Sequence, residues 1–295
     1  MSANWKAHIA LFSVALIYGA NFSIAKVVLD GGFIGPLAFI LLRVTTGVIL
    51  FTLLHRVWIR EKVARADLWR LMLCGLSGVA INQMFFFMGL KRTQPIHASL
   101  LMTTTPILVL IISSFLIKEK ITPKKVGGVL MGAFGAILLL SQGKQVEWNS
   151  EGLIGDIMVL INASSYAFYL VMVRKLMHRY NPITVIRLVF MFGWIFVFPF
   201  GIGELSVVDW AAFHTWIWLA VLYVLIFTTF FTYLFNAYAL SVVSPSIVSF
   251  YIYLQPLLAA SIALLMGQDK LDWTKAVSAF LIFSGVYLVS RSKTV

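Results

Sequence analysis

Long apolar segments recur along the whole chain of 295 residues, and only short polar links separate them. A helix that spans a bilayer needs about 20 predominantly apolar residues. Ten segments meet this length, and they cover residues 8–29, 35–55, 69–90, 96–117, 124–142, 152–173, 182–202, 214–239, 245–266 and 273–290. The pattern therefore predicts an all-α polytopic membrane protein with ten transmembrane helices. No link is long enough to form a separate soluble domain.

The composition agrees with this prediction. Hydrophobic residues make up 61% of the chain and charged residues 12%, whereas soluble domains average about 45–50% apolar and about 25% charged residues. This excludes a secreted disulfide scaffold, a disordered chain and a simple cytosolic enzyme. The single cysteine, Cys74, excludes an intramolecular disulfide and a cysteine-based metal site. The five histidines show no metal-ligand spacing, so we expect no metal and no cofactor.

The net charge of +12 would fit an acidic partner, but in a membrane protein the placement of Lys and Arg matters more than their number. With ten spans and an inner N-terminus, fifteen Lys and Arg fall in inner segments and six in outer ones. Because positive residues concentrate in cytoplasmic loops, we expect both termini in the cytoplasm and the protein in the cell (plasma or inner) membrane. The expected partners are the lipid bilayer and a small-molecule substrate, and no nucleic acid.

The chain also contains an internal repeat. A shift of 150 residues aligns residues 85–140 with 235–290 without a gap, and a shift of 146 residues extends the match upstream. Two prolines eleven residues apart recur in both halves, as Pro95 and Pro106 and as Pro245 and Pro256. The sequence thus predicts two copies of one five-helix unit, which span residues 8–142 and 152–290.

An odd number of helices in each copy has a topological consequence. The second copy enters the membrane from the opposite side, so the two copies form an inverted repeat. Many secondary transporters have this architecture, with the substrate site near the middle of the bilayer between the repeats. The sequence therefore favours a transporter that works by alternating access.

The repeated residues resemble a known family. The pattern comprises Pro95, Pro106, Glu119, Gly128, Gly132 and Gly135, then Pro245, Pro256, Asp269 and Gly285, together with Tyr18-Gly19-Ala20-Asn21-Phe22 and Leu42-Arg43. It resembles the drug/metabolite transporter superfamily permeases of the EamA family, with two EamA repeats over nearly all of the chain. The resemblance implies a ten-helix exporter or importer of small metabolites, but members differ in substrate. Asp269 stands where the family often has Glu, and the last helix has fewer glycines.

Proline residues mark two expected helix breaks. Pro106 and Pro256 fall about halfway along the fourth and ninth spans, where each removes a backbone hydrogen bond and frees a carbonyl four residues earlier. Polar residues flank both breaks, namely Thr103, Thr104, Tyr253 and Gln255. These residues either line a substrate cavity or belong to kinks that neighbouring helices satisfy.

Amide side chains are the second group of candidates. Asn21, Asn82, Gln83, Asn162 and Asn236 lie in apolar segments, where each is costly unless it is paired. Asn162 shares a helical face with Tyr166 and Tyr169. Together these residues predict a pocket for a neutral or zwitterionic amphipathic solute. The alternative for each amide is a hydrogen bond between helices.

Arg43 is the sharpest single candidate. It lies about 12 Å into the second span at 1.5 Å per residue, and an arginine inside a membrane is a functional candidate by default. It would bind a carboxylate or phosphate through two parallel hydrogen bonds, or anchor a neighbouring helix through backbone carbonyls. No carboxylate lies near the middle of a span, which favours facilitated diffusion or exchange, although Asp156 keeps proton antiport open.

These features predict a secondary transporter, not an enzyme, that moves amino-acid-like or other small amphipathic metabolites, with export favoured. One alternative is a phosphate-ester or nucleotide-sugar antiporter of the same architecture, which would need more positive charge at the site. A membrane-embedded lipid-modifying enzyme is a third possibility, but no acidic, histidine or nucleophile constellation supports it. The Gly128-x-x-x-Gly132 pattern packs within the chain or forms a dimer contact, so we expect a monomer or a weak homodimer.

Overall fold

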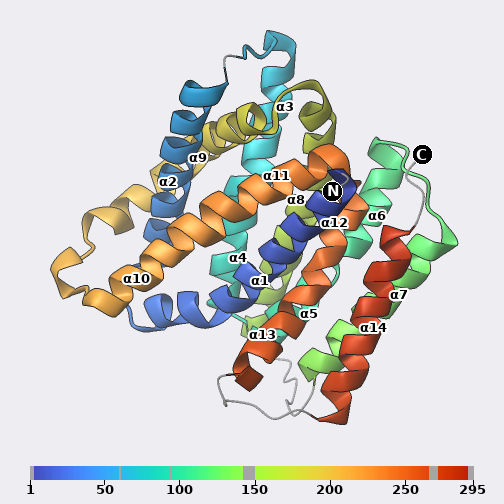
Figure 1. The fold of residues 1–295 in the computed structure, drawn as a ribbon. Helices are drawn as coiled ribbons and strands as arrows, with labels where there is room; N and C mark the ends of the chain where they lie inside the picture. The colour runs from blue at the N-terminus through green and yellow to red at the C-terminus, as the bar shows by residue number, and fades with distance from the viewer. Residues whose placement is uncertain (1–2, 60, 94, 142–149, 266–271, 292–295) are drawn as a thin grey trace.

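The computed structural model describes residues 3–59, 61–93, 95–141, 150–265 and 272–291 (Figure 1). In these ranges the chain is helical, with no strand. The α-helices are α1 (Ala3–Asp30), α2 (Pro36–Trp58), α3 (Arg65–Gly75), α4 (Asn82–Leu90), α5 (Pro95–Met102), α6 (Thr105–Leu116), α7 (Pro123–Ser141), α8 (Ser150–Arg179), α9 (Pro182–Ser206), α10 (Thr215–Tyr223), α11 (Thr232–Val242), α12 (Pro245–Phe250), α13 (Leu254–Leu265) and α14 (Trp273–Ser290).

Non-α segments join several of these helices into longer rods. The π-helical segments η1 (Leu76–Ile81) and η3 (Val224–Phe231) connect α3 to α4 and α10 to α11. A 3-10 segment, η4 (Tyr251–Tyr253), connects α12 to α13, and a second 3-10 segment, η2 (Trp210–Ala212), precedes α10. The predicted third and eighth spans are therefore single rods with a π-helical middle.

Among the described residues, eight helices are long and apolar enough to cross a membrane, by length and composition. They comprise Pro36–Trp58, Arg65–Leu90, Pro123–Ser141, Gly152–Arg179, Pro182–Ser206, Thr215–Val242, Pro245–Ile262 and Trp273–Ser290. A shorter apolar helix, Leu100–Leu116, occupies the predicted fourth span. The predicted first span lies in α1, which has 28 residues. The all-helical membrane class is confirmed, whereas the count of ten spans is not reproduced in full.

Local sequence signals explain where the helices begin. Proline fits the first turn of a helix because its missing N–H would have no partner there, and it opens α2, α5, α7, α9 and α12. Asn181 caps α9 by accepting a hydrogen bond from the Ile183 N–H at 3.0 Å. Asp272 caps α14 by accepting one from the Lys275 N–H at 2.9 Å.

The helices pack in pairs that cross the two halves of the chain. In Figure 1, α1 runs beside α11 and α13, while α8 packs against α4 and α6. The closest pairs are α2 with α9 and α7 with α14. Each half therefore completes its packing with helices of the other half, and the two halves form one bundle.

Glycines allow the close approach of α7 and α14. A Cβ on Gly128 would lie 2.8 Å from the Gly285 carbonyl oxygen, and one on Gly132 would lie 2.6 Å from the Phe250 ring. The Gly128-x-x-x-Gly132 pattern thus serves contacts within the chain.

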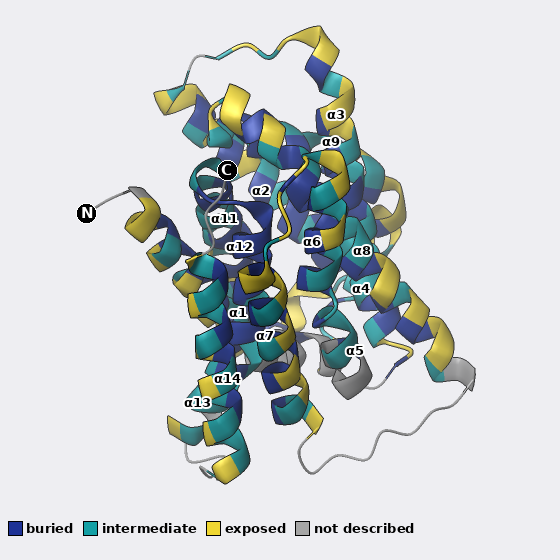
Figure 2. Cartoon of the chain, turned by 90° about the vertical axis from the view of Figure 1, so that its right-hand side faces the viewer, coloured by how far each residue is buried: buried dark blue, intermediate teal, exposed yellow. Residues whose placement is uncertain are grey.

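The outside of the bundle is apolar. Figure 2 shows exposed positions along α7 and α14. Leu130 and Phe134 of α7 and Phe280 of α14 are each at least 60% exposed. The beginning of α1 and the end of α14 lie at the same end of the molecule, which we call the terminal end (Figure 1). An apolar exterior of this kind is what lipid contact requires.

Candidate functional site

Arg43 lies inside the bundle. It is the eighth residue of α2, about 10 Å from the beginning of the helix at 1.5 Å per residue, and its exposed fraction is 7%. Its Nε donates a hydrogen bond to the Thr229 hydroxyl at 3.0 Å. The two terminal nitrogens of the guanidinium donate to no described residue, and no described carboxylate forms an ion pair with Arg43.

The π-helical segment η3 positions the partner of Arg43. In a π-helix the backbone bonds run between residues five apart, and such segments are frequent at functional sites. The Thr229 hydroxyl donates to the Val224 carbonyl, five residues earlier, at 3.0 Å and accepts from Arg43. The neighbouring Thr228 hydroxyl donates to the Asn21 Oδ1 at 3.0 Å. Two adjacent threonines of η3 therefore reach α2 and α1.

Two tyrosines interact with this arginine, and two further tyrosines interact with both of them. Tyr18 on α1 and Tyr233 on α11 interact electrostatically with Arg43, and both also interact with Tyr166 and Tyr169 on α8. The ring centroids of Tyr166 and Tyr169 are 6.0 Å apart. The structure thus brings together side chains from the two halves of the chain.

Gln83 on α4 completes this group. The Gln83 side chain lies beside Tyr233, and only 4% of the residue is exposed. Neither polar atom of the amide has a hydrogen-bond partner of standard geometry among the described residues. Because a buried, unpaired amide is costly, Gln83 is poised to bind a polar ligand. We call this set of side chains the central cluster, and it comprises Tyr18, Arg43, Gln83, Tyr166, Tyr169 and Tyr233.

Other predicted amides act mainly between helices. Asn162 donates through its Nδ2 to the Asn82 backbone carbonyl at 2.5 Å, while its Oδ1 has no described partner. Asn21 is paired with Thr228. The half-buried side chains of Asn236 and Gln255 form no hydrogen bond with a described residue.

The two helix breaks contact each other. The Tyr253 hydroxyl, in the second break, donates to the Thr103 carbonyl, in the first, at 3.0 Å. The hydroxyls of Thr103 and Thr104 donate to carbonyls of their own helix, each at 2.6 Å. Here the contacts match the alternative of kinks satisfied by neighbouring groups, and Pro106 is buried behind them. Pro256, at the second break, is half-buried.

Sequence reasoning missed Tyr18, Tyr233 and Thr229 as site residues. Thr229 and Tyr233 are four residues apart, and this spacing places polar groups on one helical face. That signal was available in the sequence, but the π-helical turn that brings Thr229 to Arg43 was not.

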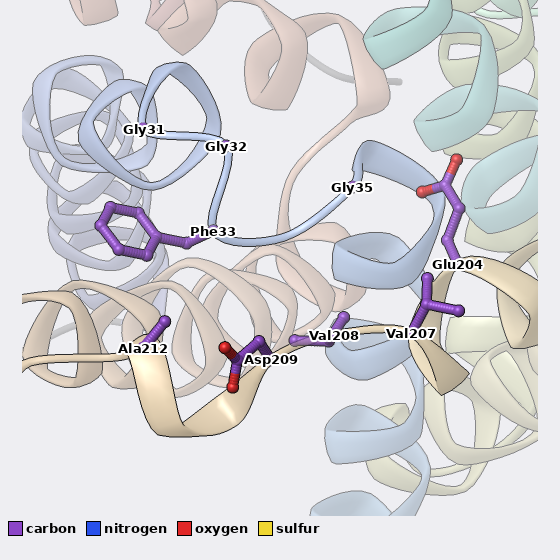
Figure 3. A pocket seen from close by; sticks show the side chains of 9 residues that line it. All are labelled: Gly31, Gly32, Phe33, Gly35, Glu204, Val207, Val208, Asp209 and Ala212. Carbon is purple, nitrogen blue, oxygen red and sulfur yellow. The ribbon is translucent and has the colours of Figure 1, made fainter.

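A pocket of about 450 Å³ lies at the end of the bundle opposite the terminal end (Figure 3). It lies between the α1–α2 link and the α9–α10 link, and its lining includes Phe33, Glu204 and Asp209. Glu204 accepts hydrogen bonds from the N–H groups of Leu37 at 2.9 Å and Ala38 at 3.1 Å. This carboxylate is therefore occupied as a cap of α2.

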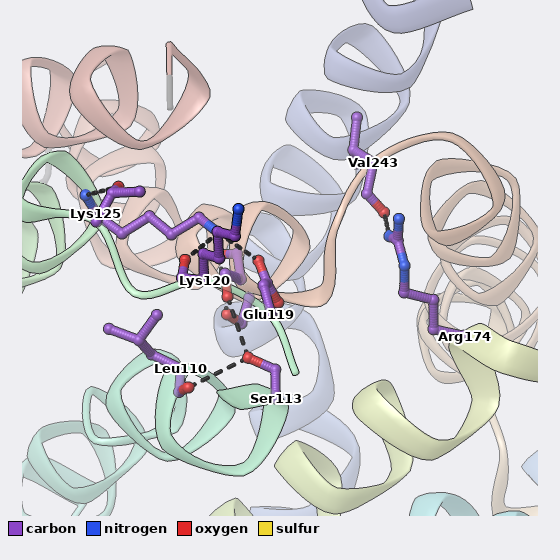
Figure 4. Close-up of polar contacts among 10 residues, drawn as sticks. Leu110, Ser113, Glu119, Lys120, Lys125, Arg174 and Val243 are labelled. Atoms are coloured by element: carbon purple, nitrogen blue, oxygen red, sulfur yellow. Dashed lines mark hydrogen bonds and ion pairs between the residues drawn. The ribbon is translucent and has the colours of Figure 1, made fainter. Parts of the chain in front are cut away.

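Polar contacts join neighbouring helices at the terminal end. Figure 4 shows Arg174 of α8 donating to the Val243 carbonyl, at the end of α11. Its neighbour Lys175 donates to the Leu116 carbonyl, at the end of α6, at 3.2 Å. The hydroxyls of Ser113 on α6 and Ser246 on α12 are 3.5 Å apart. The contacts of Lys175 and of Ser113 tie helices of the first half to helices of the second half, whereas the contact of Arg174 joins two helices of the second half.

Residues 5–141 and 153–291 each match the EamA-like transporter family. The chain belongs to this family. Over 292 residues it is 28% identical to an uncharacterized transporter of Archaeoglobus fulgidus, covering 98% of this chain and 99% of that protein. Over 72 residues it is 35% identical to the aromatic amino acid exporter YddG of Ancylobacter novellus, covering 24% of this chain and 25% of that protein.

A solved crystal structure has the same fold. It matches with a TM-score of 0.80 and 21% identity, over 97% of this chain and 98% of that one. The arrangement of helices described above is therefore one that the solved structures already contain.

Replacing Gly78 is expected to disturb the central cluster. A Cβ at Gly78, in η1, would lie 2.4 Å from the Tyr169 ring, and overpacking a buried site typically costs about 1–3 kcal/mol. Gly78→Ala should therefore lower the free energy of unfolding in detergent by about that amount. Gly127→Ala is the matched control, because a Cβ there meets no atom within 4 Å. Equal stability of the two variants would contradict the packing of Tyr169 on η1.

Proposed function

We propose that this protein is a secondary transporter that moves small amphipathic solutes by alternating access. In this proposal ten helices form two inverted five-helix repeats, with α1 as the first span and α5 with α6 as the fourth. The observation that carries the proposal is the exchange of helix contacts. Span one packs on spans eight and nine, and span six packs on spans three and four. Such reciprocity is expected of two repeats related by a two-fold axis in the membrane plane.

The positions of the π-helical segments and helix breaks also support a two-fold relation between the repeats. The π-helical segments occur in the third and eighth spans, and the breaks occur in the fourth and ninth. Thr103 and Tyr253, which contact each other, are also equivalent under the 150-residue repeat. A contact between equivalent residues is expected at the two-fold axis itself.

The proposed topology places both termini in the cytoplasm. The terminal end carries Arg56, Lys120 and Arg179, all exposed, as the distribution of positive residues in membrane proteins requires. The contacts that close this end then form a cytoplasmic gate, and the pocket lined by Phe33 faces the outside. The cell membrane is the proposed location.

The proposed substrates are amino-acid-like or similar amphipathic metabolites, and the proposed direction is export. The tyrosines of the central cluster offer aromatic surface, and Gln83 and Arg43 offer hydrogen bonds. A relative over part of its length is named an aromatic amino acid exporter. A phosphate-ester antiporter is less well supported, because Arg43 is the one cation of the central cluster. The described contacts of Gly128 and Gly132 lie within the chain, so a monomer is the proposed functional unit.

Asp156 does not lie at the middle of a span, where a proton-carrying carboxylate would be expected. It is buried near the beginning of α8 and accepts a hydrogen bond from the Thr93 hydroxyl. Exchange or facilitated diffusion is therefore the proposed mechanism.

Metabolite profiles of cells test the substrate and the direction together. The medium of an overexpressing strain is compared with that of a strain without the gene. We expect one or a few amphipathic solutes to be enriched outside the overexpressing cells only. The same solutes enriched inside these cells would contradict export.

A further inference from the structure

One nitrogen of the Arg43 guanidinium is hydrogen-bonded, and the other two have no hydrogen-bond partner among the described residues. Thr229 fixes the Nε at 3.0 Å, and η3 in turn fixes Thr229 through the Val224 carbonyl. The two terminal nitrogens have no described partner. A positive charge that is 7% exposed inside an apolar bundle is costly without an anion. An anchoring arginine would donate hydrogen bonds from its terminal nitrogens to carbonyls of neighbouring helices. Among the described residues, Arg43 forms no such bonds.

The groups around Arg43 indicate which anion would fit. A carboxylate matches the planar fork of a guanidinium and accepts two parallel hydrogen bonds. The hydroxyl of Tyr18, which interacts electrostatically with Arg43, is a further donor for such an anion, whereas the Tyr233 hydroxyl donates to the Gly78 carbonyl at 3.4 Å. A phosphate would need more positive charge, and Arg43 is alone in this respect within the central cluster. The rings of Tyr166 and Tyr169 provide an apolar surface for the rest of the solute.

We propose that Arg43 is the carboxylate-binding residue of the central cluster, and that the transported solute is a small carboxylate with an apolar or aromatic body. The inference rests on the proposed function, because it assigns the solute class of that same site. Tyr18 orients the carboxylate, and the Gln83 amide binds a second polar group of the solute.

Binding to the purified full-length protein tests this assignment without any transport. The probes are two matched pairs, 3-phenylpropionate with 3-phenylpropionamide and L-leucine with L-leucinamide. A ligand that binds the folded state stabilises it by RT ln(1 + [L]/Kd), so the rise in melting temperature over a titration yields Kd for each probe. Because charge-assisted hydrogen bonds are roughly twice as strong as neutral ones, we expect each acid to bind at least about tenfold more tightly than its amide.

Two variants locate the preference at Arg43. Arg43→Gln should reduce the ratio of amide Kd to acid Kd to about one, since a neutral side chain loses the charge-assisted bonds. Arg43→Lys retains the positive charge, so it should keep part of this ratio. It also provides a test if Arg43→Gln does not fold. Arg187→Gln is the matched control. It removes an arginine of α9 whose Nη1 lies 3.4 Å from His55, outside the central cluster, and it should leave the ratio unchanged.

The outcomes separate the two proposals. Equal affinity for acid and amide in the wild-type protein, or a preference that survives in Arg43→Gln, would overturn the carboxylate site. Tight acid binding by a protein that moves none of these probes across a membrane would support the carboxylate site and contradict the proposed transport.

Discussion

The double substitution Ser113→Cys and Ser246→Cys is expected to abolish transport under oxidising conditions and to restore it on reduction. The two hydroxyl oxygens lie 3.5 Å apart on α6 and α12, and both residues are at most 1% exposed. Facing side chains at this distance come within reach of a disulfide, whose Cβ atoms are about 3.5–4.5 Å apart. The bond would join the two halves at the terminal end and prevent that end from opening.

The measurement is solute uptake into proteoliposomes before and after reduction. The background carries Cys74→Ala, because Cys74 is the one native cysteine and is buried. Each single cysteine variant serves as a control and should transport at the same rate in both conditions. The cross-link is verified by mass spectrometry. If the cross-linked protein transports as fast as the same protein after reduction of the disulfide, the terminal end does not need to open.

Lys125→Met is expected to destabilise the protein strongly. The Lys125 Nζ lies 2.8 Å from the Glu119 Oε1, with exposed side-chain fractions of 1% and 4%, and it also donates to the Lys120 carbonyl at 3.0 Å (Figure 4). Removing one partner of a buried pair leaves an uncompensated charge and typically costs about 3–5 kcal/mol. The free energy of unfolding, measured by reversible unfolding in mixed micelles, should fall by about that amount.

A second variant separates the lost pair from lost packing. Adding Glu119→Gln to Lys125→Met removes the orphaned charge and should recover much of the loss. Lys120→Met, at an exposed position of the link between α6 and α7, should change the free energy of unfolding little. If Lys125→Met were as stable as Lys120→Met, Glu119 and Lys125 would not form a buried ion pair in the membrane.

The sequence alone predicts the helical membrane class and the candidate importance of Arg43. Apolar segments of spanning length and an isolated arginine depend on residue type alone, so both can be recognised in the sequence without knowledge of how the helices pack. The prolines at 106 and 256 indicate that two helices are broken, but not that Tyr253 would satisfy the Thr103 carbonyl. That contact depends on how the two halves meet.

The π-helical segment η3 explains why sequence reasoning missed Thr229. In an apolar helix nothing in the residue pattern marks a change from four-residue to five-residue backbone bonds. Thr228 and Thr229 lie in η3, and their hydroxyls bond to α1 and to α2 respectively. Asn21 accepts a hydrogen bond from η3, while the Gln83 amide lies beside Tyr233 without a hydrogen bond of standard geometry among the described residues. Burial in an apolar segment gives the same sequence signal for both amides.

Counterflow in proteoliposomes tests the central claim most directly. Vesicles that contain the purified protein are loaded with an unlabelled small carboxylate and diluted into a trace of the same labelled solute. A carrier that exposes one site alternately to the two sides predicts a transient accumulation of label above its equilibrium level, which disappears in the oxidised Ser113→Cys and Ser246→Cys variant. Label that rises to equilibrium without an overshoot, or does not enter for any solute that the protein binds, would contradict alternating access.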